Sequence, residues 1–343
     1  MIKLFIRYIN LMVITIFALV LLSFMLPFFF PGDLLTNISG ITPQSLEQRQ
    51  ALEKAFALNE SIFVQFQVYL SNFFAGDWGV SSVSQLNLYD EIAYAFPATL
   101  ELMLYALFVA TFVGIPVGFL SGLKHHNPAD MGVVTFSIVG YSFPVFWLAL
   151  VFITLFCLQL EWLPMSGRID LLFEVKHITG FVFIDIILSD LNNTKEAIEN
   201  AFRHAILPTL SISIVTTCLF IRFTRRSIMD VMQKGYIIAA KSRGFTQWQI
   251  FIKHSFKNAL IPILPILALQ ISTLVTNAMI VETIFSWPGI GNWLIQAIYQ
   301  QDYPAIRAGM LVVALFVLTL TITLEFITRA IDPTKDETAR AAV

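Results

Sequence analysis

The chain has 343 residues, of which 57% are hydrophobic and only 13% are charged. Soluble domains carry about 25% charged residues, so the composition excludes an ordinary soluble protein and indicates an integral membrane protein. The net charge of −2 gives no argument for a nucleic-acid partner. Both cysteines, Cys157 and Cys218, lie inside apolar runs, so we expect buried thiols rather than a disulfide or a metal site.

Six apolar runs without charged residues follow one another along the chain, and a membrane-crossing helix needs about 20 such residues. The first run is too long for a cleaved signal peptide and lacks a cleavage site, so we expect an uncleaved first span. Gly140 and Pro144 predict a kink within the third run. The predicted spans are Ile9–Phe30, Leu102–Leu123, Val133–Leu160, Ala205–Ile221, Asn258–Val281 and Ala308–Leu324. The sequence therefore predicts an all-α integral membrane protein with six transmembrane helices.

Two long polar segments separate the runs. The first segment, residues 31–97, is expected to form an extramembrane loop unit with helices over Ser45–Phe56 and Val64–Phe74 and a turn after them. In the second segment, Glu161–Arg203, the apolar stretch Ile178–Leu188 is only half as long as a span, which favours a packed or interfacial helix. Glu101 stands at the entrance of the second span and is interpreted as a solvated or helix-terminal charge. The predicted organisation is a head and first span over 1–30, the loop unit over 31–97, a core of five spans over 98–329, and a tail over 330–343.

The distribution of Lys and Arg predicts the orientation in the membrane. An even number of spans places both termini on one side, together with the segment Arg222–Lys257, and that side carries 14 of the 21 Lys and Arg residues. Because basic residues collect in the cytoplasm, both termini and this segment are expected to be cytoplasmic.

The segment Arg222–Lys257 is the most basic part of the chain, with eight Lys and Arg residues and a single acid, Asp230. Gly244 predicts the end of one helix. Thr246 and Gln249 form a capping-box pattern that predicts the start of another. Helical spacing predicts one apolar face for this second helix, formed by Trp248, Ile252 and Phe256. A pair of helices with a basic rim suits docking of another protein at the membrane surface.

Several motifs resemble those of a known family. Tyr236–Gly244, followed by Asn258–Pro262, resembles the cytoplasmic "EAA" loop of ABC importer permeases of the dipeptide/oligopeptide/nickel subfamily. Phe285–Gly291 and Gln301–Pro304 are similar to the extracellular hairpin of that subfamily. Other signatures of the first loop are matched at Gly76–Gly79 and Pro97–Glu101. The loop from Trp162 to Asp190 is most similar to Sap-type permease B subunits, which are linked to antimicrobial peptides and putrescine export.

The resemblance implies a type I ABC importer permease in the bacterial inner membrane. Such a permease moves peptides, including antimicrobial peptides, or polyamines such as putrescine, while dipeptide, oligopeptide or nickel import stay open as alternatives. The implied partners are a homologous second permease, two nucleotide-binding ATPase subunits and a periplasmic solute-binding protein. The sequence contains no G-x-x-x-x-G-K-[ST] motif, so ATP and Mg²⁺ are expected on the partner ATPase subunits, with no cofactor, metal or catalytic residue in this chain.

The same resemblance implies a coupling helix over Tyr236–Arg243 that lies in a groove of the ATPase. Small side chains would permit close approach, the basic ones would meet acidic residues of the partner, and the glycine would permit the following turn. The residues concerned are Tyr236, Ala239, Ala240, Lys241, Arg243 and Gly244. The glutamate that names the loop is absent near Ile238, so no carboxylate role is assigned. The alternative is an amphipathic surface helix without a coupling role.

A polar stripe in the fifth run and a turn after it complete the candidate sites. The stripe predicts either a translocation path or interhelical hydrogen bonds worth about 0.6 kcal/mol each, and it consists of Gln270, Thr273, Thr276 and Asn277. In the turn, Pro288 is expected to fix φ and Gly289 to adopt a positive φ. Together with Trp287 they predict an outer hairpin or gate that contacts a binding protein, or else a stiff connector. Glu282 and Asp302 flank it, either to attract a cationic substrate or as solvated charges.

Two other functions compete with the permease. A stand-alone secondary transporter or channel would be expected to carry titratable residues within its spans, and the six runs contain no charge. A membrane-tethered nucleic-acid or signalling protein is a weaker alternative, because the basic segment has no helix face rich in Lys and Arg.

Overall fold

The computed structural model describes residues 2–125 and 127–331. The regular structure of this part of the chain is helical, with loops between the helices and one isolated antiparallel bridge between Val80 and Asn87. Five helices are long and apolar enough to cross a membrane, or six if one bent pair counts as a single span. The predicted all-α membrane fold is confirmed, and the predicted tail lies outside the described residues from 332 onward. The long helices are α1 (Ile2–Met25), α5 (Leu88–Val109), α6 (Ile115–Leu123), α10 (Thr194–Met232), α14 (Leu264–Ile284) and α16 (Tyr303–Ile331).

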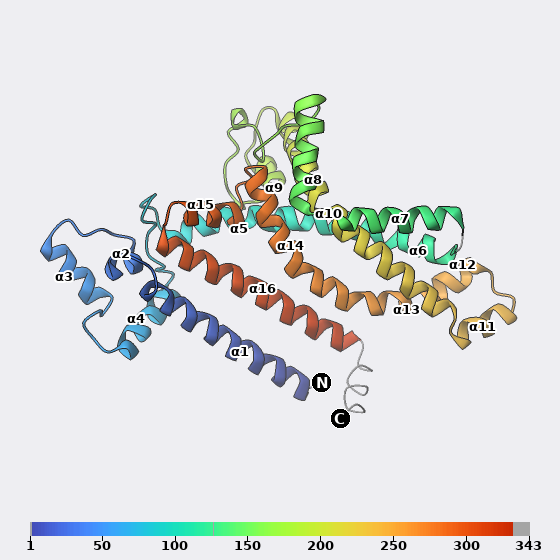
Figure 1. Cartoon of the computed structure of the whole chain (residues 1–343), viewed down its shortest axis with the longest axis horizontal. Coiled ribbons are helices and arrows are strands. Elements are labelled where there is room, and N and C mark those ends of the chain that lie inside the picture. The colour runs from blue at the N-terminus through green and yellow to red at the C-terminus, as the bar shows by residue number, and fades with distance from the viewer. Residues whose placement is uncertain (1, 126, 332–343) are drawn as a thin grey trace.

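The third predicted span is broken rather than kinked. Helix α7 (Pro128–Ser142) ends before Pro144, and α8 (Val145–Phe152) continues as a π-helical segment to Gln159. The two parts meet at 96°, and α8 stands away from the layer of the other helices in Figure 1. Phe143 is extended, with φ −84° and ψ 131°, because the residue before a proline is pushed out of the helical region.

Several helices extend beyond the apolar runs that predicted them. Helix α5 begins at Leu88, so the predicted domain boundary at residue 97 falls inside it, and it passes through a π-helical turn into α6. Helix α10 has 39 residues, whereas its apolar run has 17. The helical stretch Trp248–Leu267 is also long and apolar enough to cross a membrane, and it begins within the basic segment, before α14. Polar residues continue these helices because backbone hydrogen bonding does not require an apolar sequence.

Helix α10 is the centre of the molecule. It packs against α5, α6, α7, α8 and α14, and 72% of the residues in its most apolar 18-residue stretch are buried. Gly114, at the end of the π-helical turn, and Gly118 and Gly122 on α6 recur every four residues and let this stretch approach the backbone of α10 closely. In contrast, α1 and α16 lie side by side at the edge (Figure 1). Only 22% and 11% of the residues in their most apolar 18-residue stretches are buried. Helix α1 therefore presents most of its apolar surface to lipid or to another subunit, whereas most residues of α16 are partly buried.

The loop unit contains three helices, α2 (Leu34–Ser39), α3 (Leu46–Ala55) and α4 (Ile62–Ala75), at one end of the molecule (Figure 1). The last two confirm the predicted helices, and a turn follows α4 with φ of +79° at Gly76 and +88° at Gly79. Ser23 of α1 accepts a hydrogen bond from the Tyr69 hydroxyl at 3.1 Å, which ties α4 to the first span. In the second loop, α9 (Val182–Leu188) packs on Ala197 and Ala201 of α10, as expected of a helix too short to cross.

Candidate functional site

The basic segment contains the short helix that the sequence predicted. Helix α11 (Gly235–Ser242) is followed by Gly244, whose φ of +81° lies in the left-handed region where glycine ends helices. The Thr246 N–H donates to Gln249 Oε1 at 2.9 Å, and the Gln249 N–H donates to Thr246 Oγ1 at 3.3 Å. The predicted break and capping box are confirmed, and α12 (Gln247–Ile250) begins there.

One face of α11 is anchored and the other is free. Ile237 is fully buried and Ala240 is 7% exposed. Both belong to a cluster formed with Phe119, Ile228, Val231, Ile250 and Ala259. The exposed side chains include Tyr236, Ile238, Ala239, Lys241 and Arg243. The two alanines therefore differ, because Ala240 holds the helix to the membrane core whereas Ala239 points outward and leaves room for a close partner.

The predicted apolar face of the second helix is wrong. Trp248 and Ile252 are 63% and 68% exposed, and Phe256 is 42% exposed. A π-helical turn over Phe251–Ser255 precedes α13 (Phe256–Leu260), and it adds one residue to a turn. The buried positions therefore follow a spacing of five and then four residues, and they are Ile250, Ser255 and Ala259. A sequence pattern based on regular α-helical spacing cannot predict this change in which residues are buried.

A buried ion pair, which the sequence analysis missed, joins the helices next to the basic segment. Both carboxylate oxygens of Asp130 on α7 accept from Arg225 on α10, at 2.6 and 2.7 Å, and Asp130 also accepts from the Ser121 hydroxyl. Asp130 is only 4% exposed. A bidentate pair constrains the relative position of its two partners. Together with the Ser121 hydrogen bond, it therefore ties α6, α7 and α10 to one another. The two residues are 95 positions apart, and no local pattern connects them.

The polar stripe of α14 faces away from the core. Thr273 and Thr276 are exposed, and Gln270 and Asn277 are partly exposed. The opposite face packs into the main core through Leu274, Val275, Ala278 and Val281. Of the stripe, only Thr276 makes a side-chain hydrogen bond among the described residues, to its own helix at Ser272 O. The alternative of hydrogen bonds to neighbouring helices within this chain therefore finds no support in the described residues.

The outer turn between α14 and α15 (Ile290–Tyr299) is rigidly packed. Trp287 is fully buried and donates from Nε1 to Ala98 O at 2.9 Å. The prediction of a positive φ at Gly289 is wrong, because φ is −95° there and Ser286 takes the left-handed conformation at +49°. A glycine is required at position 289 for another reason, because a Cβ there would lie 2.3 Å from the carboxyl carbon of Glu282.

Glu282 and Asp302 are buried rather than solvated, with exposures of 0% and 2%. Glu282 Oε2 accepts from the N–H groups of Gly291 at 2.8 Å and Asn292 at 3.1 Å, so the carboxylate caps the N-terminus of α15. Asp302 binds the Ser81 hydroxyl and, at 3.1 Å, the Ser82 N–H, which joins the loop unit to α16. Each acid connects two elements, and neither is free for a substrate.

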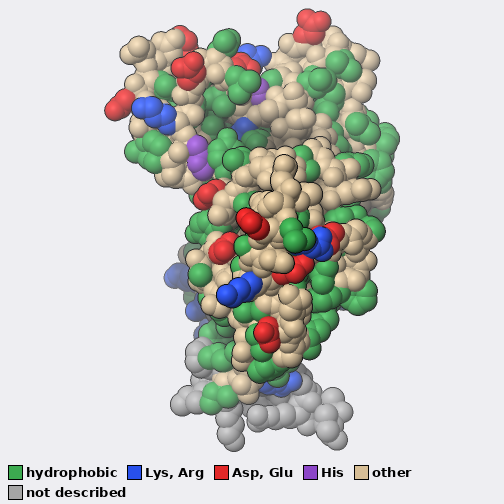
Figure 2. Space-filling model, turned by 90° about the vertical axis from the view of Figure 1, so that its left-hand side faces the viewer, with side chains coloured by type: hydrophobic (Ala, Val, Ile, Leu, Met, Phe, Trp, Pro, Cys, Tyr) green, Lys and Arg blue, Asp and Glu red, His purple; other side chains and the backbone are tan. Residues whose placement is uncertain are grey.

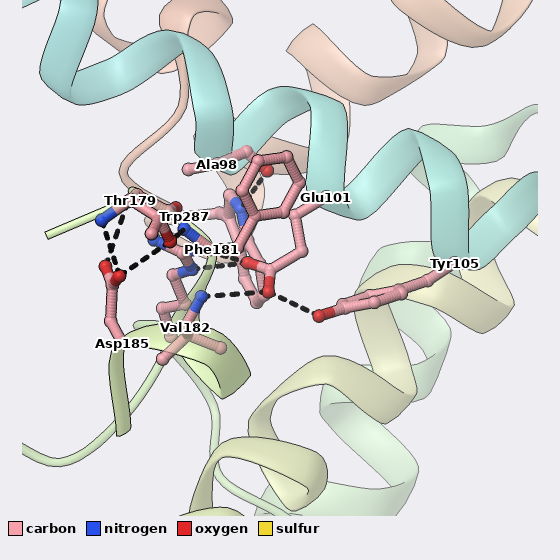
Figure 3. A network of polar contacts seen from close by, with 10 residues as sticks. Ala98, Glu101, Tyr105, Thr179, Phe181, Val182, Asp185 and Trp287 are labelled. Atoms are coloured by element: carbon pink, nitrogen blue, oxygen red, sulfur yellow. Dashed lines mark hydrogen bonds and ion pairs between the residues drawn. The ribbon is translucent and has the colours of Figure 1, made fainter. Parts of the chain in front are cut away.

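Glu101 is the centre of a buried network (Figure 3) and not the solvated charge that the sequence suggested. Its carboxylate accepts from Tyr105, from the Val182 N–H at 3.0 Å, and from Arg168 Nε at 2.7 Å. The Arg168 guanidinium also lies 5.7 Å from the ring centre of Trp287 and donates to Gly180 O at 2.6 Å. The network joins α5, the loop over residues 161–193 and the outer turn, and burial makes such a pair costly to break.

The loop over residues 161–193 is held by a second acid, Asp185. Burial acts to raise the pKa of Asp185, but hydrogen bonds outweigh it and hold the pKa below its usual value. They come from the Thr179 hydroxyl and N–H, both at 2.7 Å, and from the Gly180 N–H at 3.0 Å (Figure 3). Beside it a cavity of about 590 Å³ opens between this loop, Tyr94 of α5 and Pro288 of the turn. Within the described residues, no group of three or more His, Cys, Asp or Glu is placed to hold a metal ion.

Comparison with known proteins decides the family. Residues 114–337, which include α6, the basic segment, the outer turn and α16, match the binding-protein-dependent transport system inner membrane component family. The chain belongs to this family. It is therefore a multi-pass inner-membrane component of a transport system.

Two relatives match over nearly the whole chain. The putrescine export system permease protein SapB of Escherichia coli K12 is 40% identical over 330 residues, 96% of each chain. The di/tripeptide transport system permease protein DppB of Pseudomonas aeruginosa is 36% identical over 324 residues, 94% of this chain and 95% of the relative. An inward-facing structure of the MetNI methionine ABC transporter has a TM-score of 0.50 at 16% identity, and it covers 68% of this chain and 93% of that one. This likeness shows the fold of an ABC importer permease.

Proposed function

We propose that the chain is the permease subunit of an ATP-driven transporter for peptides or polyamines, with both termini in the cytoplasm. Its partners are a second, homologous permease, two ATPase subunits that bind ATP and Mg²⁺, and a periplasmic binding protein. Support for the substrate class comes from relatives named for putrescine, peptide and di/tripeptide transport. Family membership favours this function over a stand-alone secondary transporter or channel.

The observation that carries the proposal is the divided surface of α11. Ile237 and Ala240 fix the helix to α10 and α6, while Tyr236, Ala239, Lys241 and Arg243 project from it. A helix that is packed against the core on one side and presents basic, apolar and small side chains on the other transmits a displacement of the ATPase to α10. Gly244 and the Thr246 capping box set the angle at which the next helix leaves.

The test of coupling is a pair of matched charge substitutions. Ala239→Glu places a carboxylate on the exposed face of α11 and touches no core residue, so we expect normal insertion but at least a roughly tenfold loss of ATPase association, since an unpaired charge buried in an interface costs more than 1.4 kcal/mol. Ala129→Glu makes the same change at an exposed position in the first turn of α7. Association is measured by co-purification of the ATPase with the tagged permease. Equal recovery of the ATPase with wild type and Ala239→Glu would refute the role of α11.

The substrate is tested in the reconstituted complex. The transporter in sealed vesicles should hydrolyse ATP faster with its substrate, in the presence of the binding protein for an importer and without it for an exporter. Putrescine, a dipeptide and a longer cationic peptide are compared at equal concentration, and accumulation inside or outside the vesicles gives the direction. Absence of stimulation and of transport by all three would refute the proposed substrate class.

A further inference from the structure

A cavity under the loop unit contains a buried arginine without a counter-ion. It is enclosed by α1, α4, the turn after α4 and the first turns of α16. Arg307 lines it and is 7% exposed. Among the described residues no carboxylate lies within 4.0 Å of its guanidinium. It donates one hydrogen bond, to Ile38 O at 3.2 Å, and lies 5.5 Å from the ring centre of Tyr69. Most of its five N–H donors therefore have no acceptor within the part of the chain that the structure describes.

A second unsatisfied group lines the same cavity. Gln65 donates from Nε2 to Leu58 O and Glu60 O, at 3.2 and 3.0 Å, but its Oε1 is buried and has no partner among the described residues. An unpaired buried charge and an unpaired buried acceptor each cost stability. A ligand that satisfies both must offer an oxyanion to Arg307 and a hydrogen-bond donor to Gln65.

The size of the cavity limits what enters it. About 40 Å³ is open to the centres of water-sized groups. One ordered water needs roughly 10–15 Å³ by this measure, so the space holds about three waters or one small oxyanion such as a phosphate group. A larger ligand has to extend out of this space. Of the two charged lining residues Arg307 is buried and Asp77 is exposed, so the positive group lies deeper than the negative one.

The position of the cavity indicates the source of the ligand. It lies where the loop unit meets the ends of α1 and α16, two helices that are long and apolar enough to cross a membrane. Phe74, whose ring contacts the lining residue Phe73, is 82% exposed, which suits contact with acyl chains. Figure 2 shows basic and acidic side chains interspersed over this end of the molecule, so no broad positive field accounts for anion binding there.

We propose that this cavity binds the headgroup of a zwitterionic phospholipid, with the phosphate on Arg307 and the ammonium between Gln65 Oε1 and Asp77. The order of charges matches phosphatidylethanolamine, whose ammonium lies beyond its phosphate, and disfavours phosphatidylglycerol, which offers Asp77 no cation. The bound lipid neutralises Arg307 and fixes α4 to α16.

The test is native mass spectrometry of the full-length chain after incubation with vesicles of equal phosphatidylethanolamine and phosphatidylglycerol. We expect retained phosphatidylethanolamine, and about a tenfold loss in Arg307→Gln, the loss of one charge-assisted hydrogen bond. Arg49→Gln makes the same change at an exposed, ion-paired arginine of the loop unit and should retain lipid as wild type does. Asp77→Asn should bring the two lipids closer to equal retention.

Substitute variants and a free-anion control complete the test. If Arg307→Gln does not fold, Gln65→Leu and Asp77→Asn carry the test, and both should lower phosphatidylethanolamine retention without changing the helical circular dichroism. Inorganic phosphate at millimolar concentration is the free-anion control. Equal lipid retention in wild type and the folded variants overturns the proposal. Arg307-dependent binding of inorganic phosphate with no retained lipid also overturns it, because the site would then take a free anion.

Discussion

At the residue scale, Glu282 and Gly289 depend on each other. The carboxylate of Glu282 caps α15 through two backbone N–H groups, and it occupies the space that any side chain at residue 289 would need. The φ of −95° at Gly289 suits every residue type, so the glycine is required by close approach and not by backbone conformation. Pairwise contact of this kind makes a specific prediction about two substitutions and their combination.

Gly289→Ala should lower the stability of the purified chain by about 1–3 kcal/mol, because the new methyl group collides with a buried carboxylate. Glu282→Ala should cost a similar amount through the lost cap. In the double variant the collision is gone, so the two losses should not add. Thermal unfolding followed by circular dichroism gives the three values, with Glu199→Ala, an exposed acid, as control. Simple additivity would contradict the proposed contact.

At the element scale, the close contact of α6 with α10 decides whether the basic segment is placed correctly. A Cβ at Gly118 would lie 2.7 Å from Ile221 O, and little can move because that atom belongs to the backbone of the central helix. Gly118→Ala should therefore destabilise the chain by about 1–3 kcal/mol. Gly132→Ala on α7 has no neighbour within 4 Å and should stabilise it by up to about 1 kcal/mol. Melting temperatures that shift equally in both variants would contradict this packing.

The same scale shows which features follow from sequence. Apolar runs predicted the approximate positions of the membrane helices, and the glycine and capping-box rules predicted the break at Gly244 because both depend on neighbours within four residues. The π-helical turn at Phe251–Ser255 and the 96° break at Pro144 were missed or underestimated, since packing decides them. Glu101 was misread as solvated because its partner Arg168 is 67 residues away. Long-range pairs of buried charges leave no local pattern.

At the scale of the whole molecule, the chain has one central helix, apolar helices at its edge, and a polar stripe on α14 that bonds to no other helix among the described residues. Thr273 and Thr276 are exposed on a helix whose other face is core. Polar side chains in a membrane face protein or water, so a second permease subunit should lie against this face, with the translocation path between the two. In the proposed transporter, we expect the residues of the stripe to alternate between contact with water and burial in a closed path as the partner subunits hydrolyse ATP.

Cysteine labelling tests this arrangement in the assembled transporter. Thr273→Cys and Asn277→Cys should react with a membrane-impermeant thiol reagent, at a rate that changes at least about threefold between ATP-bound and nucleotide-free states, as expected when the free-energy difference between two conformations shifts by about 0.7 kcal/mol or more. Met310→Cys on α16 is 45% exposed and lies outside the polar stripe, on a helix that we expect to be covered by lipid or another subunit, so it should stay unlabelled in both states. The native Cys218 is buried and Cys157 partly buried, so a background with both replaced by alanine is used. Labelling of residue 310 as fast as residue 273 would show that exposure alone explains the reaction, and the path would then have to lie elsewhere.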